Sequence, residues 1–227
     1  MAINKDMKLS EMGTFLLGEV KEQVLYEIAP ILHLGYSPGG YFGVTRQIVC
    51  MIDFLGALYC GFDPKKDIQV QKKRTVKYIA SSKKALRFID EIFGSIDRNY
   101  QESGKYLIEM YRHGLVHLYQ PKELKLDDSK VLSWLPYKGG RTTDILVSEN
   151  RIIKNASHLC IVANLGQHFL PVSIKCLYDD LLTAIDIYMG KLRSSKELRD
   201  RFISTANEIR EPEEFSDNAD LREVHGT

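Results

Sequence analysis

The sequence lacks the short signatures that identify many enzymes and membrane proteins. It has no glycine-rich phosphate loop, because the glycine pairs at 39–40 and 139–140 are too short and are not followed by Lys and Ser or Thr. It also has no Gly-x-Ser-x-Gly nucleophile motif, no run of about 18 apolar residues, and no apolar signal-peptide core near its start. We therefore expect a cytoplasmic protein that has no cofactor and does not span a membrane.

Cysteine content and net charge add few constraints. The four cysteines, Cys50, Cys60, Cys160 and Cys176, include no Cys-x-x-Cys pair, and their spacing fits neither a zinc site nor a disulfide framework. We expect them to be buried, reduced thiols. The net charge of +1 argues neither for nor against a nucleic-acid partner.

The pattern of apolar residues predicts a mainly α fold. With 227 residues, of which 44% are hydrophobic and 27% charged, the chain is long enough for one packed domain over 1–209. An acidic segment at 210–227 is poor in apolar residues, which predicts a disordered tail. Apolar residues at helical spacing predict helices over 16–30, 42–59, 75–93, 100–119, 171–192 and 194–209.

The pattern changes between the fourth and fifth of these helices. Segments 130–135, 144–148 and 157–163 have the composition of strands, and residues 137–141 have that of a turn. The predicted fold class is therefore a helical bundle with a small antiparallel β insertion at about 130–163.

The most informative segment is Tyr111-Arg112-His113-Gly114-Leu115-Val116-His117. Arginine is a permanent cation whose forked donors fit a phosphate, and histidine exchanges a proton near neutral pH. On an ideal helix, Leu107 and Tyr111 face the core, whereas Arg112, His113, Val116 and His117 lie on the opposite side. An apolar Val116 within that polar face favours a homodimer that covers it.

This segment has an arginine, then a polar residue, and a histidine five positions after the arginine, and it lies near the end of a predicted helix. The pattern resembles the motif of the HEPN domains. This resemblance implies a helical bundle that forms dimers and, in many members, cleaves RNA without a metal ion. Arg112 matches the arginine, His113 the polar residue and His117 the histidine. By this resemblance His117 would transfer a proton, Arg112 would stabilise charge on the phosphate, and His113 would position one of the two. The strand-rich segment departs from the simplest form of the family.

Several other interpretations stay open. Some HEPN members only bind RNA or act as regulatory modules, for example in toxin–antitoxin pairs. The motif face could also belong to a structural dimer with no activity, or it could contact an unknown protein partner. His113 and His117 are four residues apart and could share a metal, but no further ligand motif accompanies them. Asp53, between Ile52 and Phe54, is either an acid that orients Arg112 or a histidine, or half of a structural salt bridge.

A local excess of basic residues suggests where RNA would bind. Residues 65–87 hold nine lysines and arginines and one acidic residue. Such a cluster can follow a nucleic-acid backbone, with Lys73, Arg74 and Lys77 as the predicted substrate-binding residues. A solvated helix face is the competing interpretation.

Overall fold

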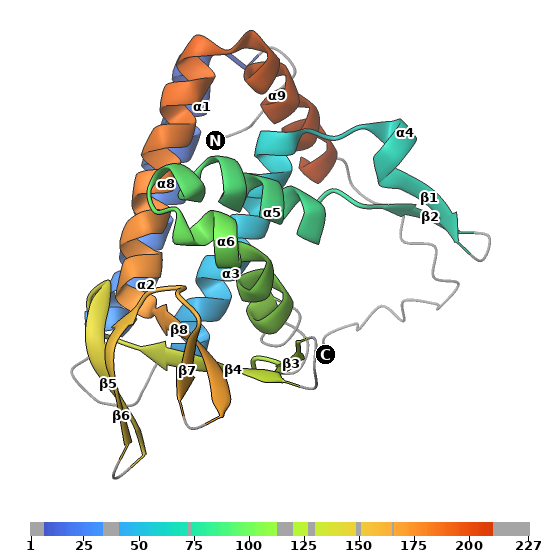
Figure 1. The fold of residues 1–227 in the computed structure, drawn as a ribbon. Helices are drawn as coiled ribbons and strands as arrows, with labels where there is room; N and C mark the ends of the chain where they lie inside the picture. Colours follow the sequence, from blue (N-terminus) through green and yellow to red (C-terminus); the bar gives the residue numbers. More distant parts are fainter. Residues whose placement is uncertain are drawn as a thin grey trace, which may run out of the picture.

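The protein is mainly α-helical, with a small mixed β region packed at one end of the helices (Figure 1). This computed structural model describes residues 7–33, 41–71, 74–112, 120–126, 130–148, 151–164 and 166–210. The prediction of a mainly α fold is therefore confirmed.

The N-terminal helical segment combines α1 (Leu9–Gly13), the π-helix η1 (Thr14–Val20) and α2 (Lys21–His33). The prediction that Pro30 ends this helix is wrong, because Pro30 lies inside α2. A proline inside a helix costs about 3 kcal/mol. Ile28 is buried before the proline, and Ile31 and Leu32 pack on the core after it, which offsets that cost.

The central helix is α3 (Tyr41–Cys60), which confirms the predicted helix over 42–59. Ile48, Ile52 and Leu55 have no exposed surface, and α3 contacts α5, α8 and α9. Within the described part of the chain, α3 is the one helix long and apolar enough to cross a membrane. The core helix of a soluble protein meets the same test, and half of α3 is buried inside this protein.

A close approach between α3 and α5 (Ser82–Glu91) depends on Gly56. A Cβ atom at Gly56 would lie 2.8 Å from the carbonyl oxygen of Lys84 and 3.0 Å from Cα of Ala85. Both neighbours are backbone atoms, so relief would require the two helices to separate. This contact brings the start of α5 next to the middle of α3.

Replacing Gly56 with alanine should therefore destabilise the protein by about 1–3 kcal/mol, the usual cost of overpacking a core. Gly43 is the matched control, because it lies in the same helix and a Cβ there meets no atom within 4 Å. Gly43→Ala should stabilise the helix by about 0.5–1 kcal/mol. Urea unfolding of both variants measures the difference, and equal effects would contradict the helix contact.

Residues 64–81 differ from the predicted helix over 75–93. They form α4 (Pro64–Asp67) and a hairpin of β1 (Ile68–Gln71) with β2 (Arg74–Lys77), which projects away from the helices in Figure 1. Thr75 and Val76 are β-branched and favour a strand. The helix begins only at Ser82, because the Ser81 hydroxyl caps it by accepting the Lys84 N–H at 3.4 Å.

The segment that carries the motif starts with the short helix η2 (Phe93–Ser95) and α6 (Asn99–Leu107) and ends in a π-helix, η3 (Ile108–Arg112). Leu107 and Tyr111 are fully buried, as predicted. The remainder of the predicted helix, at 113–119, lies outside the described residues.

The β region has a different pairing from the one predicted. Its strands are β3 (Leu124–Lys125), β4 (Val131–Tyr137), β5 (Thr142–Ser148), β6 (Arg151–Ser157), β7 (Val162–Asn164) and β8 (Gln167–Ser173). One sheet has the order β3-β4-β8-β7, and β5 pairs with β6 separately. The sheet is mixed, because β4 and β8 are parallel. Pro171 lies in β8 opposite Leu135, and not in the first turn of the next helix.

Two helices complete the fold, α8 (Ile174–Ser194) and α9 (Lys196–Arg210). Ser173 caps α8 by accepting the Cys176 N–H at 3.1 Å. The helix predicted over 194–209 begins slightly later, because the Ser195 hydroxyl caps α9 by accepting the Leu198 N–H at 3.2 Å. The predicted acidic tail beyond Arg210 lies outside the described residues.

Candidate functional site around Arg112

Arg112 is held by side chains from two other helices. Its Nε donates to Oδ2 of Asp53 in α3 at 2.5 Å, and its Nη1 donates to the Ser82 hydroxyl at the start of α5 at 3.1 Å. The side chains of Arg112 and Asp53 are 19% and 16% exposed. The guanidinium therefore has a defined position at the edge of the helical body.

This arrangement corrects the predicted exposure of Arg112. An ideal helix places Arg112 opposite the core face, with the freedom of a surface side chain. In the structure it ends a π-helical turn, which breaks the spacing assumed by that prediction. Asp53 needs a cation because an unpaired carboxylate within an apolar helix is costly. The contact is compatible with both interpretations of Asp53, the acid that orients Arg112 and the structural salt bridge.

The other predicted site residues are not brought together by the described structure. His113, His117, Val116 and Lys73 lie outside the described residues. Arg74 and Lys77 are the first and last residues of β2, and their side chains are not described. Their roles remain predictions.

The basic segment is not a continuous solvated helix face. Lys84 is 8% exposed and its Nζ lies 2.7 Å from Asp67 Oδ2, while it also donates to the carbonyl oxygen of Ile79 at 3.0 Å. Lys66 pairs with Asp63, and Arg87 pairs with Glu91 in the next turn of α5. Lys84 therefore stabilises the junction of α4 and α5, whereas Lys66 and Arg87 form exposed local pairs that contribute little.

The cysteines also differ from the prediction. Cys176 is buried, but Cys50 and Cys160 are exposed and Cys60 is intermediate. Cys50 lies one helical turn before Asp53. Partial burial and the nearby Asp53 raise the pKa of the Cys50 thiol. Cys50 is therefore less ionised than an ordinary cysteine, which does not favour a catalytic nucleophile, although an exposed thiol of this kind still reacts slowly with alkylating reagents.

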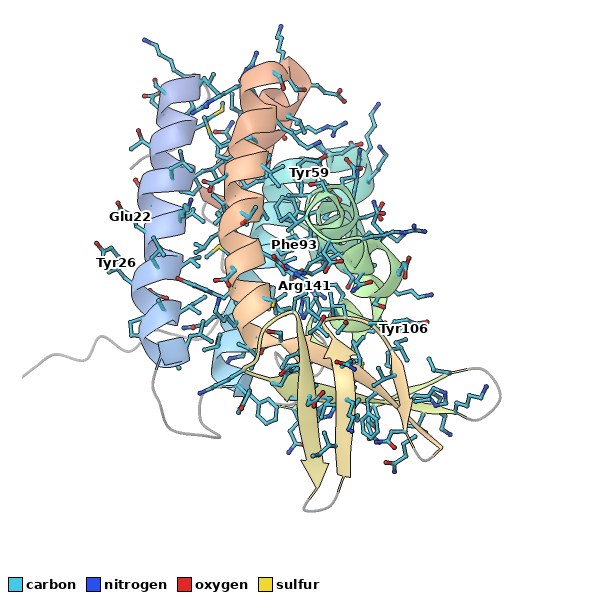
Figure 2. The ribbon with its side chains drawn as sticks, turned by 60° about the vertical axis from the view of Figure 1, so that its left-hand side comes forward. Glu22, Tyr26, Tyr59, Phe93, Tyr106 and Arg141 are labelled. Carbon is cyan, nitrogen blue, oxygen red and sulfur yellow. The ribbon has the colours of Figure 1, made fainter. Side chains whose placement is uncertain are left out.

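A second polar cluster, which no sequence pattern indicated, joins the β region to the helices. The Tyr100 hydroxyl lies 3.0 Å from Nε2 of His158 and donates to Asp180 at 2.8 Å. Nδ1 of His158 accepts the Ser173 N–H at 2.9 Å. Arg141 donates to Asp180 at 2.7 Å and also pairs with Asp97. Figure 2 shows Arg141 where the β-strands meet the helices.

The hydrogen bonds of this cluster fix the state of His158. Because Nδ1 accepts a backbone N–H, the proton of the neutral ring is on Nε2, which donates to Tyr100. Burial, with a contribution from Arg141, lowers the pKa of His158 to about 3. His158 and Tyr100 are 0% and 1% exposed, so a substrate cannot reach them. We interpret the cluster as a structural link between the β region and the helices.

Metal binding has no support among the residues that the structure describes. No group of three or more His, Cys, Asp and Glu side chains there could hold an ion. The alternative of a metal at His113 and His117 concerns residues outside that part of the chain.

Comparison with known proteins gave no match among family models, curated sequences or solved structures. The HEPN resemblance therefore depends on Arg112, His113 and His117 and on the helical context alone.

Proposed function

We propose that this protein is a cytoplasmic, HEPN-like, dimeric protein that binds RNA at Arg112 and cleaves it without a metal ion. The observation that carries this proposal is the fixed guanidinium of Arg112. Its Nε and one Nη1 donor contact Asp53 and Ser82. Arginine has five donors, and those that remain can bind a phosphate bidentately from a defined position.

The proposed chemistry uses the motif residues in separate roles. His117 removes the proton of a ribose 2′-hydroxyl or protonates the leaving oxygen. Arg112 stabilises the negative charge that develops on the phosphate, and His113 positions one of these two side chains. A second copy of the chain would bring a second set of these residues into one cleft.

The β1–β2 hairpin supports RNA binding by its position. It projects from the helical body (Figure 1), and its two strands flank Lys73 and include Arg74 and Lys77. A projecting basic hairpin can reach along an RNA backbone beyond the Arg112 site.

The purified protein should cleave single-stranded RNA in the presence of EDTA and leave DNA of the same sequence intact, because DNA lacks the 2′-hydroxyl. His117→Ala and Arg112→Lys should each lower the rate by about 100-fold or more. Arg98→Ala is the matched control, since Arg98 lies at the start of the same helical segment and its side chain is 84% exposed. Light scattering should show a dimer for all variants.

The hairpin has its own controls in the same assay. Charge reversal of Lys73, Arg74 and Lys77 to Glu should weaken RNA binding and reduce its salt dependence. Reversal of the exposed Lys122, Lys130 and Lys154 should not. RNA binding without cleavage would favour the non-catalytic module. Equal loss of cleavage in Arg98→Ala, or cleavage abolished by EDTA, would contradict the proposed chemistry.

A further inference from the structure

A cavity of about 570 Å³ lies between the N-terminal helical segment and α3, beside the end of α9. Its wall is mainly apolar and includes Phe15, Val24, Ile28, Met51, Phe54 and Ile209. A volume of this size lies within the range of small-molecule sites, which are mostly apolar with a few polar groups.

The N-terminal wall of this cavity has unusual backbone geometry. Phe15, Glu19 and Val20 belong to η1, a π-helical segment of seven residues. Such segments are rare and often occur at functional sites. The irregular turn and the cavity therefore coincide in the same stretch of chain.

The charged groups of the cavity favour a cationic ligand. Glu19 and Glu27 carry two negative charges against one positive charge on Arg46. Gln23 Nε2 donates to Glu27 Oε1 at 3.1 Å, and both of these exposed residues line the cavity, so the Glu27 carboxylate lies on its solvent-facing side. A ligand carboxylate would therefore meet a net negative wall.

One polar group of the wall lacks a partner. Gln47 lines the cavity, and its Oε1 is buried without a hydrogen bond. A buried acceptor without a donor is costly. The terminal torsion of glutamine is soft, so the amide can turn toward a ligand donor without breaking a hydrogen bond of Oε1.

We propose that this cavity binds a small amphipathic amine, an apolar chain or ring that carries a protonated amino group. The apolar part lies against Phe15, Met51 and Phe54. The ammonium group lies near Glu27 and donates to Gln47. This site is separate from the proposed RNA function and does not depend on it.

Protection of Cys50 from iodoacetamide tests the proposal, because Cys50 lines the cavity and is exposed in the unliganded protein. Cys160 is also exposed but does not line the cavity, so it is an internal control read by mass spectrometry. Decylamine should slow alkylation of Cys50 and leave Cys160 unchanged. Decanol should protect less, and decanoate at least about tenfold less than decylamine, because its charge is repelled.

Two variants separate the charge from the shape of the site. Glu27→Gln should remove the preference for decylamine over decanol. Binding of decylamine should raise the Tm of the wild-type protein. Cys50→Trp should fill the cavity and abolish this increase in Tm. Tyr26→Trp should keep the increase. Tyr26 is 76% exposed and does not line the cavity, and Figure 2 shows it pointing away from the protein.

The proposal would be overturned if none of the three compounds protected Cys50, or if decanoate and decylamine protected it equally. It would also be overturned if Cys50 were already protected in the absence of ligand and this protection were lost when the protein is diluted. The last result would show that a second copy of the chain covers the cavity. Circular dichroism confirms that each variant is folded before these comparisons are made.

Discussion

Replacing Arg112 with alanine should destabilise the protein by about 2–4 kcal/mol. The change removes the cation that contacts Asp53, whose side chain is 16% exposed, and breaking a largely buried ion pair by deleting one partner costs this order of free energy. Arg112 also loses its bond to Ser82. Urea unfolding of wild type and variant measures the loss.

A double-mutant cycle separates this ion pair from nonspecific damage. The double variant Asp53→Ala/Arg112→Ala should lose less free energy of unfolding than the two single variants lose together, because the second change leaves no buried partner behind. Arg112→Lys should recover part of the loss, since an ammonium cannot reproduce both guanidinium contacts. Additive costs would show that the two side chains are not coupled. This stability effect is also the reason to test catalysis with Arg112→Lys.

The free energy of unfolding should fall as the pH is lowered below about 6.5. Burial lowers the pKa of His158 to about 3, whereas the unfolded chain has a histidine pKa near 6.5. Between these values the unfolded state binds one more proton than the folded state. The stabilisation is therefore complete above pH 6.5, and it is lost at about 1.4 kcal/mol per pH unit as the pH falls toward 3.

The contribution of His158 is obtained by comparing variants over the same pH range. His158→Gln should lower stability at neutral pH and flatten the slope between pH 5 and 6.5. Ionisable groups remote from the cluster contribute equally to wild type and His158→Gln and cancel in the comparison, whereas Asp180, which shares the Tyr100 hydroxyl with His158, does not. An unchanged slope in His158→Gln would contradict the buried neutral ring.

The parts of the fold that the sequence predicted are those with long, regular apolar periodicity. The helices α3, α8 and α9 follow from such periodicity, with small errors at their ends. The errors arose where tertiary packing outweighed a local rule. Pro30 is tolerated because apolar residues on both sides of it are packed on the core, and Pro171 belongs to a strand because β4 pairs with it.

Contacts between distant residues limited prediction of the candidate site. The position of Asp53 between apolar residues indicates a carboxylate that needs a partner, but its contact with Arg112 spans 59 residues and no spacing rule selects it. The cluster around His158 joins residues from α6, the β region and α8, none of which forms a motif. The cavity depends on how η1 and α2 pack against α3.

The same long separations have a consequence for how the protein folds. β4 and β8 are neighbours in the sheet although three other strands, β5, β6 and β7, lie between them in sequence. Tyr100 meets His158 and Asp180 across 58 and 80 residues. Contacts of this kind close large loops and form slowly. During synthesis the cluster cannot be completed until Asp180 of α8 has left the ribosome. We expect Tyr100→Phe to accelerate unfolding and to leave the folding rate nearly unchanged, so the buried cluster determines how long the native state lasts.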